Sequence, residues 1–228
     1  MSQVSVVVPF YNEEENVTEL LREILQCLPE AEVIAVNDGS TDGTLGKLRE
    51  NGRVRVLDLP RNLGQSAALF QGLHAATGEF CVMLDGDGQN DPADIPLLLK
   101  ALEDRDFVCG VRRKRQDTWS RRLGSRWANS IRRFVLGDQA TDTGCTLKAM
   151  RREHVQHLIP FNGMHRYIPA LLGGADLRMG EVEVNHRPRR FGVSKYTLGG
   201  RALRGIWDLV GVRWYLSRQI HWPRMLKD

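Results

Sequence analysis

Three carboxylates occur within seven residues directly after an apolar run. Residues 80–84, FCVML, are typical of a buried strand, and Asp85, Asp87 and Asp91 follow in the segment DGDGQND. Like charges this close repel one another unless a cation or a charged ligand compensates them. Asp85 and Asp87 can direct hard oxygen ligands at one divalent ion, and the glycine between them lets the backbone approach it. The spacing therefore indicates a cation site at the end of a strand.

Two other interpretations of this segment exist. A stretch rich in Asp and Gly also forms ordinary surface turns, in which case Asp85 and Asp87 bind nothing. An EF-hand loop fits poorly, because the sixth and twelfth positions counted from Asp85 are Asn90 and Pro96 instead of Gly and Glu. The rest of the chain has to decide what a cation at this place would do.

The composition is that of a globular chain with an uneven charge. Of 228 residues, 42% are hydrophobic and 26% charged, and the formal charge is +4 with a pI near 9.0. Acidic residues dominate before Asp106 and arginines dominate after it, so we expect an anionic partner for the second half. The four cysteines are far apart and form no C-x-x-C pair, so we expect buried free thiols in a reducing compartment. The N-terminal residues lack a signal-peptide pattern and no apolar run is long enough to span a bilayer, so we expect a cytoplasmic chain.

Strand-like and helix-like segments alternate along the sequence. Short β-branched runs predict strands at residues 4–9, 33–36, 54–59, 80–84, 107–111, 146–150 and 181–185, and apolar spacing predicts helices at 17–28, 44–49, 62–75 and 95–102. We expect Asn12 to cap the first helix and Asp91 to cap the turn after the fourth strand. This order predicts an α/β fold with a mostly parallel sheet covered by helices on both faces.

Polar residues follow three of the predicted strands. The segments are Pro9 to Glu13, Asn37-Asp38-Gly39 and Asp85 to Asp87. In parallel sheets ligands bind outside the carboxyl ends of the strands, so the three segments should converge on one edge. Neither a G-x-G-x-x-G sequence after the first strand nor a P-loop is present. Because acidic side chains repel phosphates, this edge would need a cation to bridge a diphosphate. It can hold a base and a ribose through hydrogen bonds.

The second half combines arginines with aromatic residues. Apolar residues at helical spacing, interleaved with arginines, are Trp119, Leu123, Trp127, Ile131 and Phe134, and residues 201–228 form a second basic and aromatic stretch. Such helices suit a membrane surface, although a helix packed on the domain with solvated arginines is equally compatible. No recognised nucleic-acid motif accompanies them, so we expect no nucleic-acid partner. The basic loop 186–196 suits phosphate, or is simply solvated.

The ordered set of motifs resembles the family 2 glycosyltransferases of the GT-A fold. Within that family it is similar to the polyprenyl-phosphate hexose transferases typified by dolichol-phosphate mannose synthase. The matching segments are VVVPFYNEEENV (6–17), VNDGSTDGT (36–44), NLGQSAAL (62–69), MLDGDGQNDP (83–92), SRWAN (125–129), TDTGC (141–145) and RRFGVSKY (189–196). The resemblance implies a GT-A domain over residues 1–200. The basic and aromatic composition of the tail 201–228 suits association with a membrane or a partner.

The resemblance also implies roles for individual residues. Pro9, Tyr11, Glu13 and Asp38 would bind the nucleotide; Asp85, Asp87 and Gln89 would bind Mg²⁺ or Mn²⁺ with the diphosphate; Arg112, Arg126 and Ser194 would bind the acceptor phosphate; and Arg190 and Lys195 would close over the donor. This chain departs from the family at 113–115, where Arg-Lys-Arg replaces the aromatic or acidic residues that are common there.

The expected activity is metal-dependent, inverting transfer of a hexose from a nucleotide sugar of the GDP-mannose or UDP-glucose type. The acceptor would be polyprenyl phosphate at the cytoplasmic face of the membrane, where the chain would be peripheral, with or without a separate membrane protein. An ionised lipid phosphate can attack without a strong base. Asp142 is the candidate if a base is needed. The alternatives are a saccharide or other hydroxyl acceptor in cell-envelope polysaccharide synthesis, and a basic binding module with an inactive site.

Overall fold

A computed structural model of the chain describes residues 3–112, 130–189 and 199–219, and for 199–204 the backbone alone. Seven strands form its sheet: β1 Val4–Phe10, β2 Glu32–Asn37, β3 Val54–Asp58, β4 Phe80–Met83, β5 Phe107–Arg112, β6 Lys148–Arg151 and β7 Met179–Val184. The α-helices are α1 Glu14–Cys27, α2 Thr44–Glu50, α3 Gln65–Ala75, α4 Ile95–Ala101, α6 Ile168–Gly173 and α7 Gly199–Arg218, and residues 130–136 are also helical. Three short 3-10 helices are η1 Pro92–Asp94, η2 Arg152–His157 and η3 Met164–Arg166.

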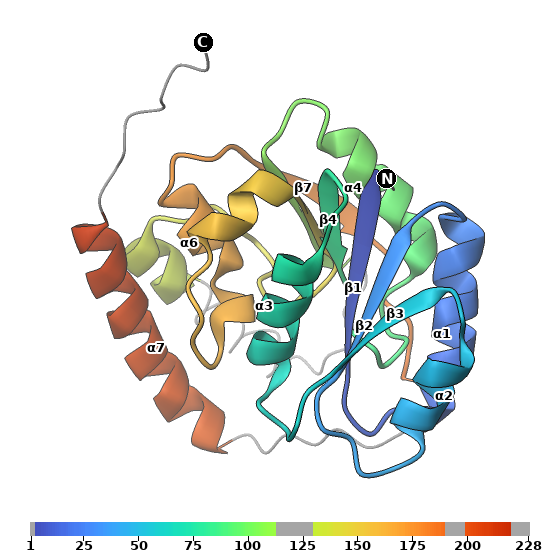
Figure 1. Ribbon diagram of the computed structural model, residues 1–228. Coiled ribbons are helices and arrows are strands. Elements are labelled where there is room, and N and C mark those ends of the chain that lie inside the picture. The colour runs from blue at the N-terminus through green and yellow to red at the C-terminus, as the bar shows by residue number, and fades with distance from the viewer. Residues whose placement is uncertain (1–2, 113–129, 190–198, 220–228) are drawn as a thin grey trace.

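The sheet is mostly parallel, as the sequence predicts. Its strand order is β3-β2-β1-β4-β6-β5-β7, and β6 alone runs antiparallel to its neighbours β4 and β5. Figure 1 shows the sheet at the centre of the molecule, with α3 and α6 in front of it and α1, α2 and α4 on the other side. The strand order places the carboxyl ends of β1, β2 and β4 next to one another.

Apolar side chains fill both faces of the sheet. One cluster joins the strands to α3, α6 and the inner side of α7, through residues such as Leu69, Leu171 and Val212. The other joins them to α1, α2 and α4, through residues such as Leu21 and Leu48. Burying a large aliphatic side chain contributes about 1.5–3 kcal/mol, so these two layers hold the strand ends in fixed positions. The predicted α/β class with helices on both faces is confirmed.

Two capping predictions had opposite outcomes. Asp91 caps the 3-10 turn after β4, as expected, because its Oδ1 accepts a hydrogen bond from Ala93 N at 3.0 Å. The prediction that Asn12 caps the first helix is wrong. Glu13 stands at the N-cap of α1, while Asn12 adopts a left-handed conformation with φ 52°. Its side chain instead accepts a hydrogen bond from Thr41 N at 2.7 Å, which ties the loop after β1 to the loop after β2.

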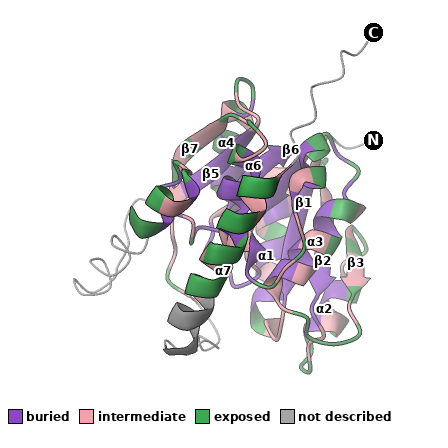
Figure 2. Cartoon of the chain, turned by 90° about the vertical axis from the view of Figure 1, so that its left-hand side faces the viewer, coloured by how far each residue is buried: buried purple, intermediate pink, exposed green. Residues whose placement is uncertain are grey.

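The helix α7 presents two apolar sides. Leu209, Val212 and Leu216 pack on the core cluster. The opposite side is exposed and carries Ile206, Trp207, Val210 and Trp214. Figure 2 shows this exposed side of α7 facing the viewer. Among the described residues, no helix combines the length and the apolar character needed to cross a membrane.

Candidate functional site

The polar segments after β1, β2 and β4 meet at one edge of the sheet. Asp38 N donates to Phe10 O at 2.8 Å, and Leu84 N donates to Val7 O at 3.3 Å, so the three chain segments leave the sheet side by side. At this edge Gly86 lies so close to β1 that a Cβ would stand 2.6 Å from Phe10 Cδ1. The expectation that these segments converge is confirmed.

Asp85 lies in the middle of this edge with both carboxylate oxygens bonded. Its Oδ1 accepts from Gln65 Nε2 at 2.5 Å and its Oδ2 accepts from Thr146 Oγ1 at 2.7 Å. Burial, followed by the charge of Asp87, raises the pKa of Asp85 to about 6. The charges of Lys148 and Arg112 act in the opposite direction. Thus the negative charge on Asp85 is disfavoured as the site stands, and a cation would stabilise it.

Asp87 is buried beside it and is paired with an arginine. Its Oδ1 accepts from Gln89 N at 3.1 Å, and its Oδ2 lies 2.8 Å from Arg189 Nη2. The Gln89 side chain lies near the same segment, with Nε2 3.5 Å from Arg187 O. Asp85 and Asp87 thus lie close enough for their charges to interact, and Gln89 contacts Asp87 through its backbone N–H. Metal binding by these three residues stays a prediction.

Asp85, Asp87 and Gln89 fit a magnesium or manganese ion that binds together with a phosphate ligand. Among the described residues no three His, Cys, Asp or Glu side chains gather into a metal cluster. Mg²⁺ seldom needs such a cluster, because it is commonly held by one or two carboxylates, substrate phosphates and water. An all-oxygen set of two carboxylates and one amide suits that arrangement. The ion would be bound together with a phosphate ligand and not by the protein alone.

The four residues expected to bind a nucleotide lie at the ends of β1 and β2, on the same edge of the sheet. Pro9 is buried at the end of β1, and Tyr11 follows it half-buried. Glu13 Oε1 lies 3.5 Å from Arg189 Nη1, so Glu13 and Asp87 contact the same guanidinium. Asp38 is buried, and its two oxygens accept from Leu63 N at 2.7 Å and Gly64 N at 2.9 Å.

The contacts of Asp38 show how the edge is built. Burial raises the pKa of Asp38, and the two backbone hydrogen bonds oppose that rise. Its carboxyl fixes the loop from which α3 begins. The neighbouring Gly39 has φ +64°, and a Cβ there would meet the backbone of Arg61, so only glycine suits this close crossing of two loops.

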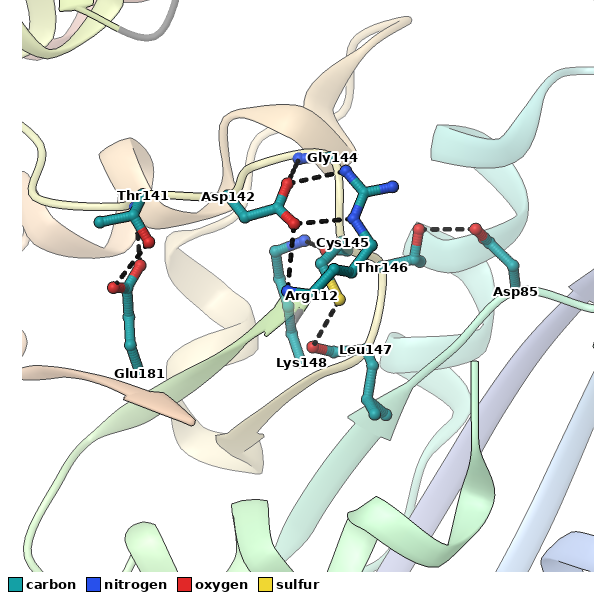
Figure 3. A network of polar contacts seen from close by, with 10 residues as sticks. All are labelled: Asp85, Arg112, Thr141, Asp142, Gly144, Cys145, Thr146, Leu147, Lys148 and Glu181. Atoms are coloured by element: carbon teal, nitrogen blue, oxygen red, sulfur yellow. Dashed lines mark hydrogen bonds and ion pairs between the residues drawn. The ribbon is translucent and has the colours of Figure 1, made fainter. Parts of the chain in front are cut away.

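A bidentate ion pair lies on the other side of Asp85. Arg112 Nε stands 2.7 Å from Asp142 Oδ2, and Arg112 Nη2 stands 2.8 Å from Asp142 Oδ1. The backbone of Arg112 and of Gly144 also donate to this carboxylate, at 3.3 and 3.2 Å. Figure 3 shows the guanidinium lying between Asp142 and the Thr146–Asp85 hydrogen bond. With four donors on its two oxygens, Asp142 is arranged to hold Arg112, which favours a positioning role over that of a base.

The segment 141–146 connects the two halves of the site. Thr141 Oγ1 donates to Glu181 Oε2 at 2.9 Å, Asp142 holds Arg112, and Thr146 donates to Asp85 (Figure 3). Lys148 follows, 2% exposed, with its Nζ donating to Cys145 O. Sequence reasoning missed Thr146, Lys148 and Gln65. The polar segment TDTGCT (141–146) is a signal for a functional turn, but it does not indicate which strand end Thr146 faces.

Arg126, Arg190, Ser194 and Lys195 lie outside the described residues. Their predicted roles toward the acceptor and donor phosphates therefore stay predictions.

Comparison with known proteins identifies the family. The family model described as "Glycosyl transferase family 2" matches residues 5–159. A dodecaprenyl-phosphate galacturonate synthase of Rhizobium johnstonii is 37% identical over 228 residues, covering 94% of this chain and 67% of that protein.

Solved structures agree with the fold. The glucosyl-3-phosphoglycerate synthase of Mycobacterium tuberculosis with phosphoglyceric acid has a TM-score of 0.74 at 22% identity, covering 97% of this chain and 87% of that chain. The same enzyme with Mn²⁺, UDP-glucose and phosphoglyceric acid has a TM-score of 0.72 at 22% identity, covering 99% and 88%. At this identity the likeness establishes the fold, and it confirms the expected GT-A architecture.

The raised pKa of Asp85 predicts how the protein without metal responds to pH. The pKa of Asp85 in the folded protein is about 6, above its ordinary value, so protonation of this carboxyl raises the free energy of unfolding. This contribution is full below about pH 4 and is lost as the pH rises through 6. In EDTA, we expect Asp85→Asn to raise the free energy of unfolding at pH 7.5 by about 1–3 kcal/mol, and the gain to shrink at pH 5. Urea unfolding at the two pH values measures this.

Asp104→Asn is the control, because that side chain is 72% exposed and should change stability at neither pH. An equal gain for Asp85→Asn at both pH values, or a loss at pH 7.5, would contradict the account of Asp85.

Proposed function

The chain belongs to glycosyltransferase family 2, and we propose that it transfers a hexose from a nucleotide sugar to polyprenyl phosphate. The observation that carries the proposal is the position of the Asp85 carboxylate, which feels the charges of both Asp87 and Arg112 while Asp142 holds the Arg112 guanidinium. The acidic pair suits a cation with a diphosphate, and the arginine suits a second phosphate. The relative named as a dodecaprenyl-phosphate galacturonate synthase supports a lipid phosphate as the acceptor.

The donor side is formed by the ends of β1, β2 and β4. Asp85, Asp87 and Gln89 would hold Mg²⁺ or Mn²⁺, with Pro9, Tyr11, Glu13 and Asp38 around the nucleoside. When bound, the metal would neutralise the charge that grows on the departing diphosphate. The glucosyl-3-phosphoglycerate synthase, which has the same fold, was solved in complex with Mn²⁺ and UDP-glucose, and this supports the choice of cofactor.

The acceptor side is formed by Arg112, with Arg126 and Ser194 from the sequence prediction. Arg112 would orient a lipid phosphate, one oxygen of which attacks the anomeric carbon while the bond from that carbon to the diphosphate breaks. A phosphate monoester is largely ionised at neutral pH, so no proton has to be removed. The contribution of Arg112 is orientation and charge, and one direct displacement gives inversion at the anomeric carbon.

The Arg112–Asp142 pair yields a test of this mechanism. We expect Asp142→Asn to lower turnover at low acceptor concentration by about 10- to 100-fold, because Arg112 loses its bidentate partner. Arg112→Lys should have a similar effect, and the double variant should lose little more, since both changes break one interaction. The pH dependence of the remaining rate should match that of the unaltered enzyme. Disappearance of its acid limb in Asp142→Asn would instead identify Asp142 as a base.

The exposed side of α7 gives a reason to place the enzyme at a membrane. Trp207 and Trp214 are 72% and 64% exposed and lie on the same side of one helix, with Val210 between them. Amphipathic helices that carry tryptophan bind in the headgroup region of a bilayer. A polyprenyl phosphate acceptor is itself held in a membrane, and a nucleotide sugar is made in the cytoplasm, so the cytoplasmic face is the proposed location.

Binding to vesicles tests this placement. We expect the protein to float with phosphatidylglycerol vesicles, and the double variant Trp207→Ser/Trp214→Ser to bind roughly tenfold less, because two interfacial aromatic anchors are lost. Leu97→Ser is the matched control, since Leu97 is also exposed but lies on α4, across the sheet from α7. Equal flotation of the double variant and the unaltered protein would refute α7 as the membrane surface.

The proposed activity is tested with purified protein, Mn²⁺, a short-chain polyprenyl phosphate and a panel of UDP- and GDP-sugars that includes UDP-galacturonate. We expect transfer from one donor, loss of that transfer in EDTA and recovery on adding Mn²⁺. Asp87→Ala should reduce it by about 100-fold or more while the circular dichroism spectrum stays unchanged. Undiminished transfer by Asp87→Ala, or transfer only to hydroxyl acceptors, would sink the proposal.

A further inference from the structure

The segment after β7 is bound to the segment after β4. Residues 185–189 run along residues 87–94, and an isolated bridge pairs His186 with Asn90 in the antiparallel sense. The polar contacts that hold it are Asn185 N to Asp94 Oδ2 at 2.6 Å, Arg187 N to Gln89 O at 2.9 Å, Arg187 Nη2 to Asp91 Oδ1 at 2.7 Å and Arg187 Nη1 to Glu23 Oε2 at 2.6 Å. These contacts with α1 and with the segment after β4 hold residues 185–187 in place. They therefore position Arg189 at the carboxyl end of β4.

Arg189 lies among the carboxylates of the donor side. Its Nη2 stands 2.8 Å from Asp87 Oδ2 and its Nη1 stands 3.5 Å from Glu13 Oε1. Burial acts to lower the pKa of Arg189, but the hydrogen bond and charge of Asp87, with the charges of Glu13 and Asp85, raise it overall. The side chain is 25% exposed, so water screens this interaction only in part. In this arrangement the guanidinium supplies the positive charge that the acidic pair requires.

A divalent ion needs the same oxygen. An ion held by Asp85 and Asp87 would lie within a few ångströms of the Arg189 guanidinium, and the two positive charges would repel each other. The guanidinium also occupies Asp87 Oδ2 with a charge-assisted hydrogen bond, which is among the stronger bonds of its kind. Metal binding therefore has to break the Arg189–Asp87 pair.

We infer that Arg189 is an internal counter-ion that competes with the divalent cation for Asp87. It acts as a positioning residue that lowers the affinity for metal alone. Metal binds well only with a diphosphate, whose negative charge offsets the repulsion from the guanidinium. Two ligands that bind together more strongly than either binds alone are coupled in this thermodynamic sense. The inference rests on the proposed metal dependence of the site and concerns the Arg189 side chain alone.

Binding of Mn²⁺ alone, measured by calorimetry or by the electron paramagnetic resonance of free Mn²⁺, tests this role without any turnover. We expect Arg189→Gln to bind Mn²⁺ roughly tenfold more tightly than the unaltered protein, the size expected for losing a partly buried ion pair as competitor. Arg189→Lys keeps the charge and should bind Mn²⁺ nearly as weakly as the unaltered protein. Asp87→Asn should lose the binding.

Arg178→Gln is the matched control for net charge. Arg178 precedes β7 at the far end of that strand and pairs with Asp106 on the surface, so its removal should leave the Mn²⁺ affinity unchanged. Equal affinities of Arg189→Gln and the unaltered protein, with binding that still depends on Asp87, would overturn the inference and leave the proposed function standing. Absence of Mn²⁺ binding in every variant, with UDP or GDP present as well as without it, would overturn the metal dependence as well.

Discussion

The cost of holding two ionised carboxylates, Asp85 and Asp87, in a buried place is the constraint on which the rest of the site depends. Burial first, and the charge of Asp87 second, make Asp85 costly to ionise, and its raised pKa expresses that cost. The surrounding groups reduce it: Thr146 and Gln65 donate hydrogen bonds to Asp85, and Arg189 pairs with Asp87. The negative charge of the two carboxylates is thus compensated only in part, and a bound cation would compensate it further. This is what a site for a metal diphosphate requires.

Among the described strands, β6 is the one that runs antiparallel, and the turn before it connects this pair to Arg112. Because β6 lies between β4 and β5, the turn that precedes it passes the ends of both. One end of the turn reaches Asp85 through Thr146, and the other reaches Arg112, at the end of β5, through Asp142. A continuous parallel order would need a crossover helix at this place and would leave no short segment to join the two sides. The topology therefore sets the distance between Asp85 and Arg112.

Local features of the sequence predict the fold well and the site in part. Runs of apolar and β-branched residues identify the seven described strands, even β3 and β7, which are buried only in part, and Asp91 caps a turn two residues away. Asn12 shows the limit, because its bond to Thr41 joins residues 29 apart and no local rule foresees it. The same holds for Thr146 and Arg189, whose partners lie 61 and 102 residues away. Contacts of that range depend on strand order, which periodicity along the chain does not encode.

The uneven charge of the sequence acquires a structural meaning at this edge. Glu13, Asp85 and Asp87 come from the acidic part before Asp106, whereas Arg112 and Arg189 come from the basic part after it. A divalent cation alone would stand beside the positive charge of Arg189. A diphosphate alone would stand beside the negative charges of the two aspartates, and both arrangements are repulsive. Only both together leave each group next to an opposite charge. If the ion is needed for transfer, this balance makes the sugar nucleotide and the metal enter as one ligand.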